Sequence, residues 1–250
     1  MNEEEKLLEA RTEDQFRLCQ KYAAPRFSQF LNEAEIGTVK EFVKGRQDCN
    51  WAFFGGNEDN ERCIFGVFPE WEEPDNESFP IAILKAQAGF NRELTHRDYL
   101  GTVLSLGLER SKVGDILVRD KTAYIFVMED IADYIIFNLK KIANCGVKIK
   151  RVDKAEKLPE REYKFMNAVA ASLRLDAVLA SSLKLSRKEA SMAVLSGKVS
   201  VNHKPITDVS FLLKEGDLMS VRGEGRIILE ETGTQTRSGR IHILLKKCVR

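Results

Sequence analysis

The stretch RLDAVLASSLKLSRKEASMAVLSGKVSVNHK, residues 174–204, carries the clearest secondary-structure pattern in the chain. Its apolar residues recur at the spacing of one helix face: Leu175, Val178, Leu179 and Leu183. Asp176 is placed to cap that helix. Ser186 and Glu189 form a capping box, S-x-x-E, that begins a second helix, and Gly197 suits its end. The alternating VSV and the Asn-His turn after it then predict a hairpin strand.

Basic residues flank these elements without interrupting their apolar faces: Arg174, Lys184, Arg187, Lys188, Lys198 and Lys204. Arg187 and Lys188 open the second helix, where the helix dipole favours negative charge. Local stability would place Asp or Glu in that first turn. Cationic side chains beside helix-end N–H groups instead suit a phosphate. A phosphate-binding surface is the functional interpretation, and a solvated basic face is the alternative.

The order RLD, SRKEA, SGKVSVN and EGDLMSV resembles the S-four RNA-binding domain over about residues 172–225. In that family, two helices and the following loop form a basic surface that grips folded RNA. Carried over by position, the resemblance implies these contacts: Arg174, Ser186, Arg187, Lys198, Asn202 and Lys204. To them we add four cations by their charge and place: Lys184, Lys188, Arg222 and Arg226. His203 departs from the family, which often has Gly in this turn.

Charged residues are distributed unevenly along the chain, although its net charge is only +1. Residues 1–80 hold 9 Lys and Arg against 18 Asp and Glu, whereas residues 172–250 hold 14 against 8. This asymmetry indicates an acidic end that faces solvent or protein and a basic end that faces phosphate. The acidic end is therefore a candidate surface for a protein partner.

Other features of the composition favour a cytoplasmic protein. No apolar run is long enough for a membrane span, and the acidic MNEEEKLLEA is unlike a signal peptide. The 5 cysteines are odd in number and lack a C-x-x-C pair, so we expect reduced thiols. The 3 histidines lie far apart in sequence. We expect no metal and no cofactor.

The N-terminal region, residues 1–78, should be an acidic α/β domain. Its apolar pattern predicts helices over residues 3–22 and near 33–43, the latter capped by Asn32. WAFFGG and CIFGVF are typical of strands joined by a polar turn. The acidic, proline-containing EWEEPDNES then indicates a linker.

Residues 79–152 follow the order strand, helix, strand, strand, helix, strand, which is the ferredoxin-like βαββαβ order of an RRM. Thr95 and Asp98 cap the first helix. Tyr124 and Phe126 share one strand face, but the Lys or Arg and the Gly with which an RRM signature begins are missing. Aromatic residues at this spacing are more often core than base-stacking platforms.

Residues 153–171 form a charged joint followed by strand-like KFMNAVAA, and residues 172–250 form the S-four domain. The fold class is therefore α+β and multi-domain: an acidic α/β region, a ferredoxin-like or RRM-like middle domain, and a C-terminal S-four domain of the αL type.

Over nearly the whole chain, FFGG, FPEWEEP, LTHRDYLGTVLSLGLERSKVGDILV and NLKKI resemble the YlmH-type family of bacterial cytoplasmic proteins. The resemblance implies ribosome-linked RNA binding: docking on large-subunit ribosomal RNA near tRNA, with a role in rescue or quality control of translation. The segment Thr95–Asp115 is its most specific part. One interpretation makes this segment a core helix. The other makes it a second RNA site: His96, Arg97, Arg110 and Lys112.

Short motifs in the chain resemble parts of three enzyme classes. His96-Arg97-Asp98 lacks the other parts of a kinase catalytic site. The RLD motif suggests a pseudouridine synthase with Asp176 as catalyst, but the domain order is wrong and no catalytic domain follows. A methyltransferase would need a glycine-rich loop that residues 80–152 lack. We therefore expect a non-enzymatic RNA-binding protein, with an RNA-modifying enzyme or a ribosome-linked protein adaptor as alternatives.

Overall fold

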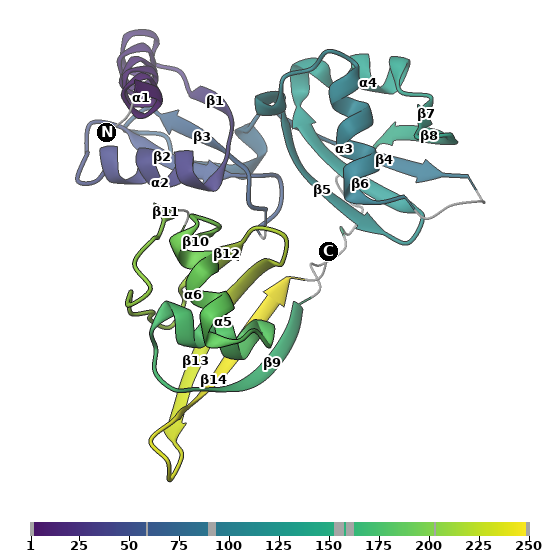
Figure 1. The fold of residues 1–250 in the computed structure, drawn as a ribbon. Coiled ribbons are helices and arrows are strands. Elements are labelled where there is room, and N and C mark those ends of the chain that lie inside the picture. The colour runs from purple at the N-terminus through teal and green to yellow at the C-terminus, as the bar shows by residue number, and fades with distance from the viewer. Residues whose placement is uncertain are drawn as a thin grey trace. The chain divides into compact units, whose positions relative to one another are not determined.

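The computed structural model describes residues 3–58, 60–89, 94–152, 158, 163–202 and 204–248 (Figure 1). The chain forms two compact units, residues 1–160 and 161–250. Both mix helices and sheets, as the sequence predicted. Most of the charged joint, residues 153–157 and 159–162, lies outside the described residues, as does His203. No helix in the described ranges is long and apolar enough to cross a membrane.

The first unit begins with two helices on a small antiparallel sheet. The elements are α1 (Glu3–Tyr22), β1 (Arg26–Leu31), α2 (Glu33–Phe42), β2 (Asn50–Phe54) and β3 (Cys63–Phe68), with strand order β1-β3-β2. Asn32 caps α2 through a complete capping box, as predicted. The sequence pattern does not reveal β1, because the register of this strand shifts between Phe27 and Phe30 and the shift breaks the alternation that marks a strand.

The second part of this unit has the predicted ferredoxin-like order. Its elements are β4 (Ile81–Ala88), α3 (His96–Ser105), β5 (Val113–Arg119), β6 (Thr122–Met128), α4 (Ala132–Asn138), β7 (Lys141–Ile142) and β8 (Cys145–Arg151), with short 3-10 turns at Asn76–Ser78, Arg110–Lys112 and Glu129–Ile131. The sheet order is β5-β6-β4-β8-β7. The core that α3 and α4 form with one sheet face includes Tyr99, Val103 and Ile135, each fully buried.

The opposite face of this sheet packs on the N-terminal sheet. Phe30 and Phe68 from the small sheet share a buried cluster with Tyr124 and Phe126 of β6. Gly56 permits this approach: its φ is +90°, and a Cβ there would lie 2.5 Å from the Phe126 ring. The acidic region and the middle region are therefore parts of one folded unit.

A buried carboxylate reinforces the contact between the two sheets. Asp115 of β5 accepts backbone N–H bonds from Glu61 at 2.6 Å and from Arg62 at 3.4 Å. The Arg62 guanidinium donates to the Phe30 carbonyl at 2.8 Å. The two bonds to Asp115 connect the loop after β2 to the middle sheet, whereas the Arg62 side chain connects that loop to β1. They give Asp115, at the end of the family-like segment, a structural role.

The second unit is a six-stranded antiparallel sheet with two helices on one face (Figure 1). Its elements are β9 (Tyr163–Ala170), α5 (Leu175–Leu183), α6 (Arg187–Leu195), β10 (Val199–Val201), β11 (Lys204–Pro205), β12 (Leu218–Val221), β13 (Gly225–Gln235) and β14 (Ile241–Cys248), in the order β11-β10-β12-β13-β14-β9. The strand expected from KFMNAVAA is β9. It pairs with β14 along its whole length, so residues 163–170 belong to this sheet and not to a joint.

Candidate nucleic-acid interface

Helix α5 begins without the side-chain cap that the sequence predicted. Arg174 occupies the N-cap position, and its side chain makes no capping bond. The loop before β12 supplies the acceptors instead: the Phe211 carbonyl accepts from the Leu175 N–H at 2.8 Å, and the Val209 carbonyl accepts from the Asp176 N–H at 3.5 Å. The interpretation of Asp176 as a helix cap is therefore wrong, because tertiary contacts already satisfy the helix end.

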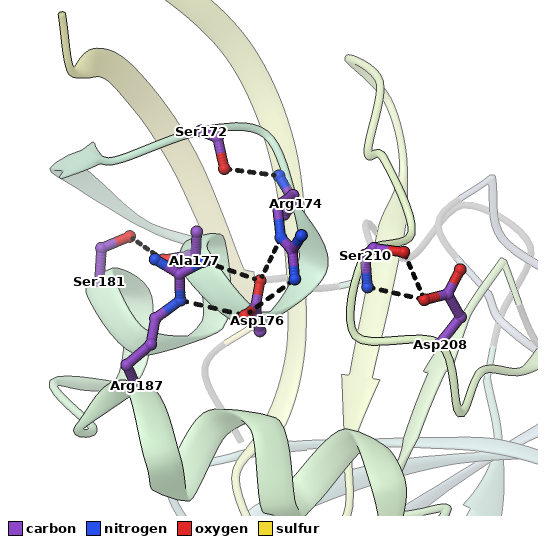
Figure 2. Close-up of polar contacts among 8 residues, drawn as sticks. All are labelled: Ser172, Arg174, Asp176, Ala177, Ser181, Arg187, Asp208 and Ser210. Carbon is purple, nitrogen blue, oxygen red and sulfur yellow. Dashed lines mark hydrogen bonds and ion pairs between the residues drawn. The ribbon is translucent and has the colours of Figure 1, made fainter.

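Asp176 instead joins Arg174, the N-cap residue of its own helix, to Arg187 of α6 (Figure 2). Arg174 donates to its carboxylate from Nε at 3.2 Å and from Nη2 at 3.5 Å. Arg187, the first residue of α6, donates from Nε at 3.0 Å and from Nη2 at 3.3 Å. We call these three residues the arginine clamp. It links the start of α5 to the start of α6 through side chains alone.

Burial differs sharply within the arginine clamp. The Asp176 side chain is 5% exposed, whereas those of Arg174 and Arg187 are 37% and 50% exposed. Burial by itself would raise the pKa of Asp176, but the hydrogen bonds from Arg174 and Arg187 lower that pKa below its ordinary value. The carboxylate is therefore ionised at neutral pH and holds both guanidinium groups.

The arginine clamp leaves donors for a ligand. Each guanidinium uses Nε and Nη2 on Asp176, and in the described part of the chain Nη1 of neither arginine has a hydrogen-bond partner. One carboxylate and two guanidinium groups leave a local charge of about +1. Two oriented, partly exposed guanidinium groups match the geometry of phosphate oxygens. This arrangement can bind a phosphate with little reorganisation.

The turn between α5 and α6 adds two exposed cations. Lys184 ends α5 in the left-handed conformation, with φ 55° and ψ 36°. Ser186 begins α6 with the predicted capping box: its Oγ accepts from the Glu189 N–H at 3.2 Å, and Glu189 accepts from the Ser186 N–H at 2.8 Å. Lys188 is exposed in the first helical turn. The Ser186 side chain is thus engaged within the domain.

A second group of predicted residues lies at another part of the same unit. Lys198, Arg222 and Arg226 line a shallow hollow of about 350 Å³ together with Ser200 and Ser220. Ser200, Ser220 and Arg226 lie across three neighbouring strands. They alternate with buried residues, so this row faces away from the helices. The ten predicted RNA contacts therefore do not form one cluster.

The remaining two predicted contacts lie in and beside the β10–β11 turn. Asn202 adopts φ 46°, and its side chain donates to Asp217 at 2.8 Å and accepts from the Leu218 N–H at 3.0 Å. These bonds account for Asn202 as a turn residue. Lys204 is exposed in β11.

The second RNA site predicted in the middle region does not form one cationic surface. Arg110 donates to the carbonyls of Val113 and Gly114, and burial together with nearby Arg62 lowers its pKa to about 10. Lys112 forms an ion pair of 2.6 Å with Asp130.

The other two residues of that site stand at the start of α3. His96 and Arg97 are exposed there, next to the Thr95 capping box. The core-helix interpretation of this segment agrees with fully buried Tyr99 and Val103.

The burial of the β6 aromatic residues decides whether they could stack on RNA bases. Phe126 is fully buried and Tyr124 is 8% exposed, both in the cluster shared with the N-terminal sheet. Base stacking of the RRM kind needs an exposed aromatic face. The structure therefore confirms the core interpretation of these side chains.

Asp176 was also the residue that suggested a pseudouridine synthase. Both of its carboxylate oxygens are bonded to arginines, and the residue is 4% exposed. Its surroundings fit a structural carboxylate. The sequence carried one unused signal for its role: the two arginines that flank it, one adjacent to its helix and one at the start of the next.

Comparison with known proteins agrees with this architecture. Residues 74–156 match the family described as "Putative RNA-binding domain in YlmH", and residues 173–218 match the S4 domain, the S-four domain named above. The chain is 29% identical over 233 residues to "Ribosome-associated protein quality control protein P2" of Bacillus subtilis (strain 168), an alignment that covers 92% of this chain and 90% of that protein.

A solved structure shares part of the fold. "Cell division protein ylmH from Streptococcus pneumoniae" superposes with a TM-score of 0.54 at 24% identity, over 64% of this chain and 97% of that chain. The resemblance to the YlmH-type family is thus confirmed: the chain carries a YlmH-type RNA-binding domain followed by a C-terminal S4 domain.

Proposed function

We propose that this protein binds structured ribosomal RNA of the large subunit, close to tRNA, through the S4 surface formed by the arginine clamp with Lys184 and Lys188. The protein binds this RNA without catalysing a reaction. Its role is in the rescue or quality control of stalled translation, and it acts in the cytoplasm. The single observation that carries the proposal is the buried Asp176, which holds Arg174 at the start of α5 and Arg187 at the start of α6.

The physical argument concerns what a pair of held arginines is suited to contact. Folded RNA is recognised mainly through phosphates, 2′-hydroxyls and helix shape. Cations fixed at a set spacing can distinguish one folded backbone from another, whereas mobile surface lysines provide attraction without shape. The B. subtilis relative, named for ribosome-associated protein quality control, supports the choice of ribosomal RNA as the ligand.

Co-sedimentation on sucrose gradients with purified large ribosomal subunits tests this proposal. The variant should avoid the buried carboxylate, because Arg187→Glu would place a second negative charge beside Asp176 and threaten folding. Lys184→Glu with Lys188→Glu reverses two exposed charges of the S4 surface instead. We expect the wild-type protein to sediment with the subunits and this variant to remain near the top of the gradient.

A matched control distinguishes an effect of the S4 surface on binding from an effect of the protein's net charge. Lys6→Glu with Lys44→Glu makes the same charge change at two exposed positions of the acidic region and should sediment like the wild type. A wild-type protein that stays at the top at low salt would rule out ribosome docking. Equal loss from both double variants would mean that overall charge, and not the S4 surface, drives binding.

One observation favours a second candidate function, a protein adaptor. Trp71 is 76% exposed within an acidic turn. The Asn50 side chain donates to the carbonyls of Glu70 at 3.0 Å and Glu72 at 3.1 Å, so the turn that carries Trp71 is held on both sides. An exposed aromatic side chain whose neighbours in sequence are acidic suits a basic protein segment.

The test of the adaptor must leave the fold intact. Deleting residues 1–78 would expose Phe126 and the rest of the shared core, so a point change is preferable. We expect Trp71→Ala to remove one protein crosslink from ribosome complexes while RNA affinity stays unchanged. An unchanged crosslink pattern would contradict the adaptor role.

A further inference from the structure

The two edges of the C-terminal six-stranded sheet differ in character. At one edge, β11 consists of only the two residues Lys204–Pro205. A short strand, a lysine and a proline are all features that keep a sheet edge from pairing with another chain. At the other edge, β9 is eight residues long and has the sequence YKFMNAVA, with one charged residue and no proline. The β9 edge therefore lacks the protection that β11 has.

Strand β9 is also regular along its whole length. It pairs with β14 in one continuous register, from Tyr163 opposite Cys248 to Ala170 opposite Ile241. Edge strands β1 and β5, by contrast, carry register shifts. Among the strands that the structure describes, β9 pairs with β14 alone. Its outer edge is therefore a straight template on which another extended strand can add by backbone hydrogen bonds.

The side chains of β9 alternate between a covered face and an open face of the sheet. Met166 and the two alternate residues that follow it pack in the core with α5 and α6. On the open face, Phe165 is 57% exposed and Val169 is 39% exposed. Asn167 lies between them and is also exposed. Two large apolar side chains are thus left at the surface of an edge strand.

A second copy of β9 is complementary to this edge. Two antiparallel copies can pair about a twofold axis at Asn167, so that each residue lies opposite the one equally far beyond Asn167 in the other copy. Phe165 of each copy then lies opposite Val169 of the other, and such a pair of an aromatic and a β-branched residue stabilises antiparallel strands. Lys164, the single charged residue, lies opposite Ala170 and not opposite a second lysine. Asn167 meets its own copy, and its amide can both donate and accept a hydrogen bond.

The cation on the neighbouring strand does not prevent this pairing. Lys246 of β14 lies directly opposite Phe165 on the open face. In the paired sheet, the two copies of Lys246 belong to strands that are three strand spacings apart, about 14 Å. This separation exceeds the screening length of about 8 Å at physiological salt. The repulsion between the two lysines is therefore largely screened.

We propose that β9 is a self-association site, through which two copies of this chain pair edge to edge and join their C-terminal sheets into one. Open-face residues pair with open-face residues, so the twofold axis is perpendicular to the sheet. Helices α5 and α6 of both copies, with their arginine clamps, then lie on the same side of the joined sheet. Residues 164–170 of each copy make the contact, fewer than the roughly 20–30 residues a side of a stable interface. The dimer is therefore weak, with a dissociation constant of about 10–100 µM.

Sedimentation equilibrium of the full chain, over a concentration range that brackets this dissociation constant, tests the proposal. The average mass of the wild type should rise with concentration from one chain toward two. Asn167→Lys and Asn167→Asp each place like charges opposite each other at the twofold axis, and each should weaken self-association about fivefold to tenfold. An equal mixture of these two variants places opposite charges there and should associate at least as tightly as the wild type. Circular dichroism establishes that each variant is folded.

A control variant and the mixture make the outcomes separable. Asn144→Lys adds the same charge as Asn167→Lys at an exposed turn outside β9 and should associate like the wild type. A wild type that remains a single chain over the whole range would overturn the proposal and leave the β9 edge to an extended segment of another protein. Equal association of the wild type and both Asn167 variants would place the dimer contact elsewhere and refute pairing at β9. If the mixture of the two Asn167 variants associates no better than either alone, the twofold axis at Asn167 is refuted.

Discussion

Replacing Asp176 by Asn separates two effects of this carboxylate on RNA binding that have opposite signs. Its negative charge stands beside the two arginines that we propose bind phosphate, so electrostatics alone predicts that Asp176→Asn tightens binding. The same carboxylate holds both arginines in position, so the geometry predicts that the substitution weakens binding. The direction of the change therefore decides whether the arginine clamp functions as proposed.

The structure gives the size of each effect. Ordering a long side chain on binding costs about 0.5–1.5 kcal/mol, so release of two arginines from the clamp should cost about 2 kcal/mol. Removal of one negative charge near a phosphate at the surface recovers less than about 1 kcal/mol, because water and salt screen it. The net expectation is a loss of about 1 kcal/mol, or roughly fivefold weaker binding.

The assay is equilibrium binding of the full chain to large ribosomal subunits at constant salt. Asp208→Asn is the matched control, because Asp208 influences Arg174 electrostatically but is bonded to Ser210, at 2.8 Å from its N–H and 2.6 Å from its Oγ. It removes the same charge without opening the clamp and should leave affinity unchanged or slightly higher. Tighter binding by Asp176→Asn would refute the clamp.

Three further predictions concern folding. Gly56→Ala should destabilise the first unit by about 1–3 kcal/mol in thermal unfolding, because its φ is +90° and its Cβ would meet the Phe126 ring; an unchanged midpoint would contradict the close packing. Ser186→Ala should cost about 1 kcal/mol, since the Glu189 N–H loses its acceptor; Ser186→Asp should restore stability. The pKa of Asp176 is lowered in the folded state, so its stabilising effect is present above about pH 4 and is lost as pH falls further. The wild type should therefore be more stable than Asp176→Asn at pH 7, and the two should converge in acid.

Local signals in the sequence were sufficient for several elements. The Ser186–Glu189 capping box, the Asn32 cap and the βαββαβ order follow from hydrogen bonds and periodicity within a few residues, and each is present in the structure. The S4 resemblance likewise depends on short motifs, and the match over residues 173–218 confirms it. Such features are predictable because the interactions that create them are near neighbours in sequence.

Features that depend on distant contacts were missed or misread. The β1 strand has an irregular register and becomes a strand only by pairing with β3. Asp176 was expected to cap its own helix, but the loop that carries Phe211 already caps it, and Arg187 arrives from the next helix. No local pattern contains this information, because the partners are brought together only by folding.

The sequence by itself determined the βαββαβ order of the middle region, the S4 motif and the division of charge between an acidic beginning and a basic end. Tertiary structure decided which side chains are buried, paired or left at the surface. It buried the β6 aromatic residues under the N-terminal sheet, engaged Arg110 and Lys112 within the middle region, and aligned Lys85 with Lys150 across neighbouring strands. The physical reason is that periodicity reports which side of an element a residue occupies, whereas only packing between elements decides whether that side is covered.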